Sequence, residues 1–538
     1  MFTARAKTVG LLILGAVIAA ALGLVSIHVP FGRDQGVAAY AAELMSRGGV
    51  LYRDFYHFNF PGIFFAYRTA FLLPLGPVEA VNLLHLLSVL VTYFLVYGAA
   101  RVELKPRAAL VAAWFYAAFA IVIYTTYWNV AQKDSLAAPF LAGMLLVLLR
   151  HGRTRDLAPK APLGTGGLLR LFGFGLLAGL AAQFKPTLGI VILAAVPAVI
   201  RERRHRGRLL AVAGLTIAGF AFAFIPLAVY LFTTGAAGPM FESVFRFGGF
   251  YGGQNYHGFF RTGLDALWQL VGWAYDWRFL TALGLIGAAA GIGSRAMRTT
   301  ALCFLLLLIQ VVAQMKFFTY HWIPLLVPLA LLAARGSEAI FSAPRGQPDG
   351  PKRWALALIL IALLFGNLGP ETKRYRRELY YDLGRTPRDN FLAAYGKWGF
   401  GDLNPLASRL AAEYVARHTE PDEPILVFGL EPGFYISAQR FPPTRFAYDQ
   451  PLVTEPGDNQ PFGAYRQELR EEFMRDISSQ PPAYIVVIED DATGIEAKDS
   501  YTQMREFPEL SGLIDRDYAL ETKIEHYYLY RRLGREGR

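Results

Sequence analysis

The chain has 538 residues, of which 54% are hydrophobic and 18% are charged, and its formal net charge is +11. A soluble globular chain carries about a quarter charged residues, and the shortfall here lies in long uncharged stretches before the last third of the chain. This composition excludes a wholly soluble protein. The basic excess lies mostly in short loops between apolar stretches, which indicates membrane topology rather than nucleic acid binding. The single cysteine, Cys303, excludes an internal disulfide, and no Cys/His spacing predicts a zinc site.

Apolar stretches follow one another along the chain, and a bilayer span needs roughly 20 residues. The stretch at 9–29 follows Arg5 and Lys7 and imitates a signal peptide, but no small-residue cleavage site follows it, so we interpret it as a retained helix. The shorter stretch Gly62–Leu75 is predicted to lie along the membrane interface. About eleven transmembrane helices are predicted, at 9–29, 78–100, 108–124, 134–150, 170–184, 186–200, 209–233, 278–294, 300–316, 321–335 and 354–369.

The basic residues predict the orientation of these spans. If the N-terminus is cytoplasmic, the inner segments hold about twice as many Lys and Arg residues as the outer loops, as the positive-inside rule requires. The loop 335–353, rich in Gly, Pro and charge, then becomes a cytoplasmic connection. An odd number of spans places everything after residue 370 outside. The sequence therefore predicts a multi-pass protein of the cytoplasmic membrane with an extracytoplasmic C-terminal domain.

Residues 371–538 are predicted to form a small soluble α/β domain, and residues 1–370 the transmembrane domain with a first outer loop at 30–77. Leu406–Arg417 has helical periodicity. Short buried strands are expected at 424–429, 484–488 and 526–530, with helices at 462–477 and 506–515 covering the sheet.

Charged, polar and aromatic residues gather in five connections, all on the predicted outer face. Charges at membrane depth are costly and usually functional, so we predict one reaction or binding site at this rim. The five connections are 32–62, 127–134, 183–186, 247–257 and 314–321.

Each acidic candidate has a structural alternative. Asp34 is a candidate general base or cation ligand, and it is equally well placed to cap a helix over Val37–Met45. Asp134 opens the span at 134–150, so it is either a cap near the positive end of the helix dipole or a site residue. Asp54, His57 and Asn59 fit structural loop roles better than catalysis when each is taken singly.

The basic candidates are also ambiguous. Lys185 lies between two apolar spans, where its side chain could snorkel to the interface or bind a phosphate. His321 stands beside Tyr320 and Trp322, which an aromatic belt would explain without any site. The Gly/Tyr run at 248–256 is either a flexible loop or a gate.

Several short motifs give the chain a family resemblance. It resembles the GT-C glycosyltransferases, in particular the family-39-like bacterial membrane proteins related to protein O-mannosyltransferases and to the lipid A aminoarabinose transferase. The motifs are Gly32-Arg33-Asp34-Gln35 through Tyr40, Gly48 through Asp54 with Pro61, Ala131-Gln132-Lys133-Asp134, Tyr320-His321-Trp322-Ile323-Pro324 and Pro421 through Gly429.

The resemblance implies sugar transfer from a polyprenyl-phosphate-linked donor to a lipid, glycan or protein acceptor on the outer face. Asp34 matches the family's catalytic base, and Asp134 matches a second acidic position. Some relatives hold the donor phosphate with a lysine where this chain has Asn59, so Lys185 or Arg53 is expected to take that role here. The remaining residues expected to bind substrate are Asp54, His57, Asn59, Tyr256, His257, Lys316 and His321.

No redox cofactor is predicted, and a divalent metal is compatible with the sequence although no motif indicates one. Two other functions use a lipid-linked saccharide. A transporter or flippase would favour paired halves and polar groups near the membrane midplane, neither of which is clear in this chain. A polysaccharide polymerase or ligase would also act outside the membrane. A non-catalytic scaffold would not need acids and cations grouped beside the bilayer.

Overall fold

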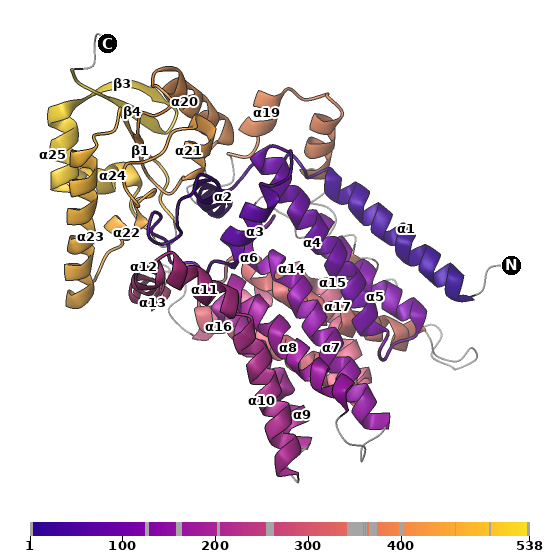
Figure 1. Cartoon of the computed structure of the whole chain (residues 1–538). Coiled ribbons are helices and arrows are strands. Elements are labelled where there is room, and N and C mark those ends of the chain that lie inside the picture. The colour runs from indigo at the N-terminus through magenta and orange to yellow at the C-terminus, as the bar shows by residue number, and fades with distance from the viewer. Residues whose placement is uncertain are drawn as a thin grey trace.

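The computed structural model describes residues 4–123, 128–157, 164–201, 205–253, 263–341, 374–396, 403–457, 459–493 and 496–534, together with residues 359, 361, 363 and 364. A bundle of helices makes up most of the molecule, and a smaller domain with a β-sheet lies against one end of it (Figure 1). The chain is thus a polytopic helical membrane protein with a C-terminal mixed-sheet domain.

Seven helical segments in the described ranges are long and apolar enough to cross a membrane, and three further apolar helices are shorter. Together they correspond to ten of the eleven predicted spans; the eleventh, 354–369, lies almost entirely outside the described residues. The bundle helices are α1 (Ala4–Leu24), α4 (Pro77–Ala100), α5 (Pro106–Ala118), η1 (Phe119–Ile123), α7 (Ala138–Leu157), α8 (Thr165–Phe184), η2 (Pro186–Ala195), α9 (Val196–Arg201), α10 (Arg206–Phe222), α11 (Ile225–Thr233), α14 (Gly263–Asp276), α15 (Arg278–Ala290), α16 (Arg295–Gln314) and α17 (Leu326–Phe341).

Small residues allow neighbouring bundle helices to approach closely, as is common inside membranes. A Cβ atom added to Gly175 of α8 or to Gly219 of α10 would collide with backbone of the other helix. The end of α17 differs from the sequence prediction, because the helix continues past residue 335 to Phe341. The predicted cytoplasmic loop 335–353 is therefore partly helical, and its later part lies outside the described residues.

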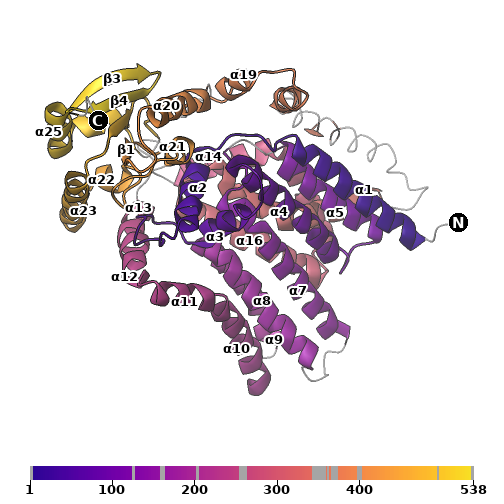
Figure 2. The ribbon, with the colours of Figure 1, turned by 45° about the horizontal axis from the view of Figure 1, so that its top comes forward.

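Short elements fill the space between the bundle and the C-terminal domain (Figures 1 and 2). The predicted interfacial helix is present as α3, nine residues long, and Gly62 at its start touches the backbone of Gln183 at the end of α8. The other elements in this region are α2 (Arg33–Ser46), α3 (Gly62–Ala70), α6 (Lys133–Leu136), α12 (Ala237–Met240), the π-helix η3 (Phe241–Phe247), α13 (Gly248–Gly253) and η4 (Thr319–Leu325).

The C-terminal domain has a four-stranded sheet in the order β1-β2-β4-β3. Strand β1 pairs in parallel with β2, which pairs antiparallel with β4, and β4 forms a hairpin with β3. Its elements are α19 (Arg388–Ala393), α20 (Pro405–Arg417), β1 (Ile425–Phe428), α21 (Gly433–Ala438), α22 (Gln450–Val453), α23 (Gln460–Ser479), β2 (Tyr484–Ile488), α24 (Ser500–Arg505), α25 (Pro508–Asp517), β3 (Tyr518–Ile524) and β4 (Tyr527–Arg532). The three predicted strands and three predicted helices are confirmed, and β3 was not predicted.

Candidate functional site

Asp34 lies in the first turn of α2, where Gly32 is the N-cap residue. The interpretation of Asp34 as a cap is therefore wrong, although the carboxylate still lies at the positive end of the helix dipole. Gln132 donates a hydrogen bond from Nε2 to Oδ2 of Asp34 over 3.2 Å, and the Tyr320 hydroxyl bonds to the same carboxylate. Asp34 is half-buried. These contacts fix one carboxylate at the end of the bundle that meets the C-terminal domain.

Asp134 and Lys185 form a buried ion pair. Nζ of Lys185 lies 3.1 Å from Oδ1 of Asp134, and the two side chains are 7% and 0% exposed. Asp134 follows the N-cap residue Gln132 in the first turn of α6, so it is not a cap either. Because Lys185 is buried and paired, the interpretation of this side chain as a snorkelling lysine is wrong.

The backbone around Lys185 explains how its side chain reaches the interior. Helix α8 ends at Phe184, and Lys185 itself is extended, with φ −155° and ψ 114°, before Pro186 starts the 3₁₀ helix η2. The missing N–H of proline suits the first position of a helix. This break between two apolar helices turns the Lys185 side chain toward α6.

Lys133 is a second cation in the same region. Its Nζ donates to Oδ1 of Asn59 over 3.0 Å, which joins α6 to the first outer loop. Lys133 was not predicted to be a site residue. The sequence feature that could have identified it is its position beside Asp134 in the Ala131-Gln132-Lys133-Asp134 motif.

Three lysines surround His321, which is 3% exposed at the start of the last described span. Lys185, Lys133 and Lys316 all interact electrostatically with its imidazole. Lys316 donates to the Tyr251 carbonyl over 3.2 Å, and its ammonium lies 4.5 Å from the centre of the Tyr251 ring. Burial lowers the pKa of Lys316 to about 8. The structure thus brings Lys185, Lys316 and His321 together from two of the predicted connections, 183–186 and 314–321.

His57 of the first outer loop contacts the C-terminal domain. Its Nδ1 is 2.6 Å from the hydroxyl of Tyr448, and its ring stacks against Phe55 and Phe58. Burial lowers the pKa of His57 to about 3, with a smaller contribution from the charge of Lys133. His57 is therefore neutral at pH 7, and it couples the outer loop to Tyr448.

Arg53 and Asp54 pair with each other. Nε and Nη2 of Arg53 each lie 2.8 Å from a carboxylate oxygen of Asp54, which also accepts the backbone N–H of Val50. The Arg53 side chain is 51% exposed. The structure records no contact between this pair and the lysines around His321 within the described ranges. Tyr256 and His257 lie outside the described residues, whereas residues 248–253 of the predicted loop form α13.

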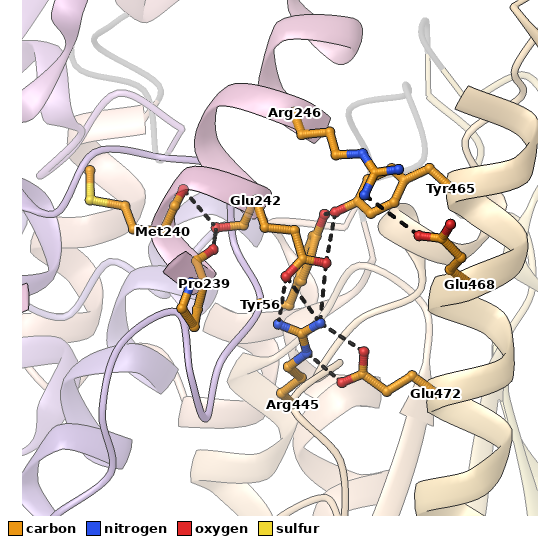
Figure 3. Close-up of polar contacts among 10 residues, drawn as sticks. Tyr56, Pro239, Met240, Glu242, Arg246, Arg445, Tyr465, Glu468 and Glu472 are labelled. Carbon is orange, nitrogen blue, oxygen red and sulfur yellow. Dashed lines mark hydrogen bonds and ion pairs between the residues drawn. The ribbon is translucent and has the colours of Figure 1, made fainter. Parts of the chain in front are cut away.

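An ion network ties the C-terminal domain to the membrane domain beside the site (Figure 3). Arg445 binds Glu472 of α23 through contacts of 2.6 and 2.8 Å, and it also reaches Glu242 of η3 at 3.4 Å. The hydroxyl of Tyr465 donates to Glu242 and lies 2.6 Å from the hydroxyl of Tyr56. The outer loop, η3 and the C-terminal domain therefore meet in one polar junction.

The assembled groups define what this region can do. One partly exposed carboxylate, Asp34, can accept a proton, and the nearby ammonium groups can bind an anion. No group of three or more His, Cys, Asp or Glu side chains in the described ranges is arranged to hold a metal ion.

Comparisons with known proteins give a family match over part of the chain. Residues 61–232 match the family of dolichyl-phosphate-mannose-protein mannosyltransferases. No curated protein sequence matches the chain significantly.

Two solved structures share its fold. ArnT from Cupriavidus metallidurans, bound to undecaprenyl phosphate, superposes with a TM-score of 0.60 at 14% identity, covering 98% of each chain. The archaeal oligosaccharyltransferase AglB from Archaeoglobus fulgidus, in complex with an inhibitory peptide and a dolichol-phosphate, gives a TM-score of 0.52 at 13% identity, covering 99% of this chain and 75% of AglB. The resemblance predicted from sequence is confirmed.

Proposed function

We propose that this membrane glycosyltransferase of the GT-C type transfers a sugar from a polyprenyl-phosphate donor to an acceptor hydroxyl on the outer face of the cytoplasmic membrane. The observation that carries the proposal is that the Asp34 carboxylate, held by Gln132, interacts electrostatically with Lys185 at the end of the bundle that faces the C-terminal domain. The phosphate-linked lipids bound to ArnT and AglB support the donor class.

Asp34 serves as the general base in this mechanism. It takes the proton from the acceptor hydroxyl while that oxygen attacks the anomeric carbon of the sugar. The bond between the anomeric carbon and the phosphate oxygen breaks, and polyprenyl phosphate leaves with the bonding electrons. Because the displacement is a single step, the anomeric configuration inverts. Gln132 and Tyr320 hold the carboxylate in place through their hydrogen bonds.

The leaving group is a phosphate, so cations rather than a general acid stabilise it. Lys133 and Lys185 are the proposed phosphate ligands. Lys133 extends to Asn59, the position at which the family resemblance places a phosphate-binding lysine, so it can replace that missing cation. Asp134 holds the Lys185 ammonium charged and oriented. Arg53 is paired with Asp54 on an exposed loop, so it is a less favoured phosphate ligand than the two lysines.

The proposed division of labour follows the two domains. Residues 1–370, with eleven spans and the outer loop 30–77, hold the donor, and its lipid tail lies along apolar helix surfaces. Residues 371–538 lie outside the membrane and help to bind the acceptor, with His57, Asn59, Lys316, His321, Asp54, Tyr256 and His257 as further substrate-binding residues. Membrane-impermeant labelling of single cysteines at position 53 of the outer loop and at exposed position 187, two residues after Lys185, should mark both on the extracytoplasmic side. Labels on opposite faces would contradict the shared site.

The catalytic proposal is tested with purified protein and a polyprenyl-phosphate sugar. The wild type should release polyprenyl phosphate in the presence of acceptor, and Asp34→Asn should lose at least about a hundredfold in rate while inserting and melting like the wild type. Undiminished turnover of Asp34→Asn would remove the proposed base. Movement of intact donor across a sealed bilayer without bond cleavage would favour a flippase instead.

The phosphate assignment is tested by moving a cation. Lys133→Met should raise the KM for the donor about tenfold or more, because it removes one of the proposed phosphate contacts. Adding Asn59→Lys to that variant puts an ammonium group back at the same point and should recover most of the affinity. Equal donor KM in the wild type and in Lys133→Met would exclude Lys133 as a ligand.

A further inference from the structure

The first turn of α2, which carries Asp34, is held from two sides. On one side Arg33 donates from Nη1 to the backbone carbonyl of Asp491 in the C-terminal domain, over 2.9 Å. On the other side Gln35 donates from Nε2 to the backbone carbonyl of Val130, also over 2.9 Å. The residues immediately before and after Asp34 therefore attach to two different parts of the molecule.

At Gly36, the residue after Gln35, the backbone of α2 lies against the backbone of the C-terminal domain. A Cβ atom built on Gly36 would lie 3.2 Å from the backbone nitrogen of Gly433 and 3.3 Å from its Cα. A Cβ atom built on Gly433 would meet only the Cα of Gly36, at 3.4 Å, which is ordinary van der Waals contact. The two glycines thus face each other between α2 and α21, and a methyl group on Gly36 would be tight enough to shift its neighbour by a few tenths of an ångström.

The rest of α2 continues along the same surface. The rings of Tyr40 and Tyr435 lie 5.4 Å apart, and Arg47 both donates to Gln439 over 2.9 Å and lies 4.1 Å above the ring of Phe441. The helix is packed along its length against α21 and the residues that follow it. This leaves α2 little freedom to shift independently of the C-terminal domain.

Charge complements this contact at the Asp34 end. The carboxyl group of Asp491 is buried, which raises its pKa, and the guanidinium of Arg33 opposes that rise. Ser500 donates to the same carboxylate through its backbone N–H, at 2.7 Å, and through its hydroxyl, at 2.6 Å. Arg33 therefore interacts electrostatically with a carboxylate that hydrogen bonds within the C-terminal domain already hold in place.

We infer that the C-terminal domain positions the Asp34 carboxylate, through Arg33 and through the Gly36–Gly433 contact. Arg33 and Gly36 are then positioning residues, and the C-terminal domain is part of the catalytic unit as well as a neighbour of the acceptor. This inference rests on the proposed function in that Asp34 is the base.

The Gly36 contact supplies a matched experiment in the full-length protein. Gly36→Ala should push α2 away from α21 by a few tenths of an ångström, and misplacement of a catalytic group by about 1 Å can cost a hundredfold in rate. We expect kcat to fall about five- to tenfold, with the donor KM within about twofold of the wild type. Because alanine is the better helix former, the melting temperature should hold or rise. Gly512→Ala, a control in helix α25 whose added methyl group meets no atom within 4 Å, should keep the wild-type kcat.

A second pair of variants gives a readout that needs no catalysis. Arg33→Met should speed amide hydrogen exchange in residues 33–40 and lower kcat, whereas Arg33→Lys should recover part of both. Equal kcat in Gly36→Ala and Gly512→Ala, or unchanged exchange of α2 in Arg33→Met, would overturn the inference.

These outcomes are separable from failure of the proposed function. If Asp34→Asn turns over normally, the proposed base is wrong, and the inference falls with it. If Asp34→Asn is inactive while Gly36→Ala is as fast as the wild type, the proposed function stands and only the positioning role is wrong.

Discussion

The buried pair of Asp134 and Lys185 makes the sharpest energetic prediction. Both side chains are almost fully buried, and their charged atoms are 3.1 Å apart. Removing one partner of such a pair leaves an uncompensated buried charge and costs about 3–5 kcal/mol. We therefore expect that loss in the free energy of unfolding for Lys185→Met, which strands the carboxylate, and for Asp134→Leu, which strands the ammonium.

The double variant separates folding from function. Replacing a buried ion pair by apolar residues of similar size is often neutral for stability, so Asp134→Leu/Lys185→Met should recover most of the stability lost by either single variant. Its release of polyprenyl phosphate should remain as low as that of Lys185→Met, because the proposed phosphate ligand is absent. A gain of stability without a gain of activity would thus assign Lys185 to the reaction and not only to the fold.

The assay is a double-mutant cycle of reversible unfolding in detergent micelles, combined with turnover measurements. The reasoning predicts a coupling energy of about 3 kcal/mol or more between the two positions. Two single losses that simply add in the double variant, or single losses below about 1 kcal/mol, would refute it. Recovery of full activity in the double variant would refute the role of Lys185 in phosphate binding.

Three further predictions concern the lysine near the site and the C-terminal domain. Because the pKa of Lys316 is lowered to about 8, turnover should fall as the pH rises through 8. Lys316→Arg, whose guanidinium stays charged, should move that fall to higher pH in a pH–rate profile. An unchanged profile would exclude Lys316 as the group that titrates. Burial, reinforced by the charge of Asp491, raises the pKa of Asp449 to about 7, so between about pH 4 and 7 this carboxyl group is protonated in the folded state and ionised in the unfolded state. The free energy of unfolding should therefore fall as the pH rises from about 4 to 7, by at most about 1.4 kcal/mol per pH unit. Urea unfolding of Asp449→Asn should lack this decline, and an identical pH dependence in both proteins would contradict the assignment. Arg445→Met should lose about 3 kcal/mol and make the C-terminal domain more sensitive to limited proteolysis, whereas Arg516→Met, which alters an exposed pair, should behave like the wild type.

Hydropathy and periodicity predicted most of the fold because lipid and a buried sheet impose strong patterns. Ten of the predicted spans correspond to apolar helices, strands β1 and β2 are continuous apolar or aromatic runs, and so is the 527–530 part of β4. Strand β3 escaped prediction because Tyr518–Ile524 is mostly exposed and mixes polar with apolar residues. Its pairing with β4 depends on a neighbouring strand and not on a local pattern.

The gathering of candidate groups from separate connections could be proposed from the sequence, but their pairing could not. Asp134 and Lys185 are 51 residues apart, and nothing in either local sequence shows that a break at Pro186 turns one side chain toward the other. The same limit explains why Lys185 looked like an interfacial lysine. The capping prediction for Asp34 failed by a small shift, because α2 begins at Arg33 and Gly32 takes the cap position.

The most direct test of the account is a structure of the protein with a polyprenyl-phosphate sugar bound. We predict that the phosphate lies within hydrogen-bond distance of the ammonium groups of Lys133 or Lys185, and that the Asp34 carboxylate faces the anomeric carbon from the opposite side. A donor whose phosphate lies elsewhere, or whose anomeric carbon is out of line with Asp34, would contradict it.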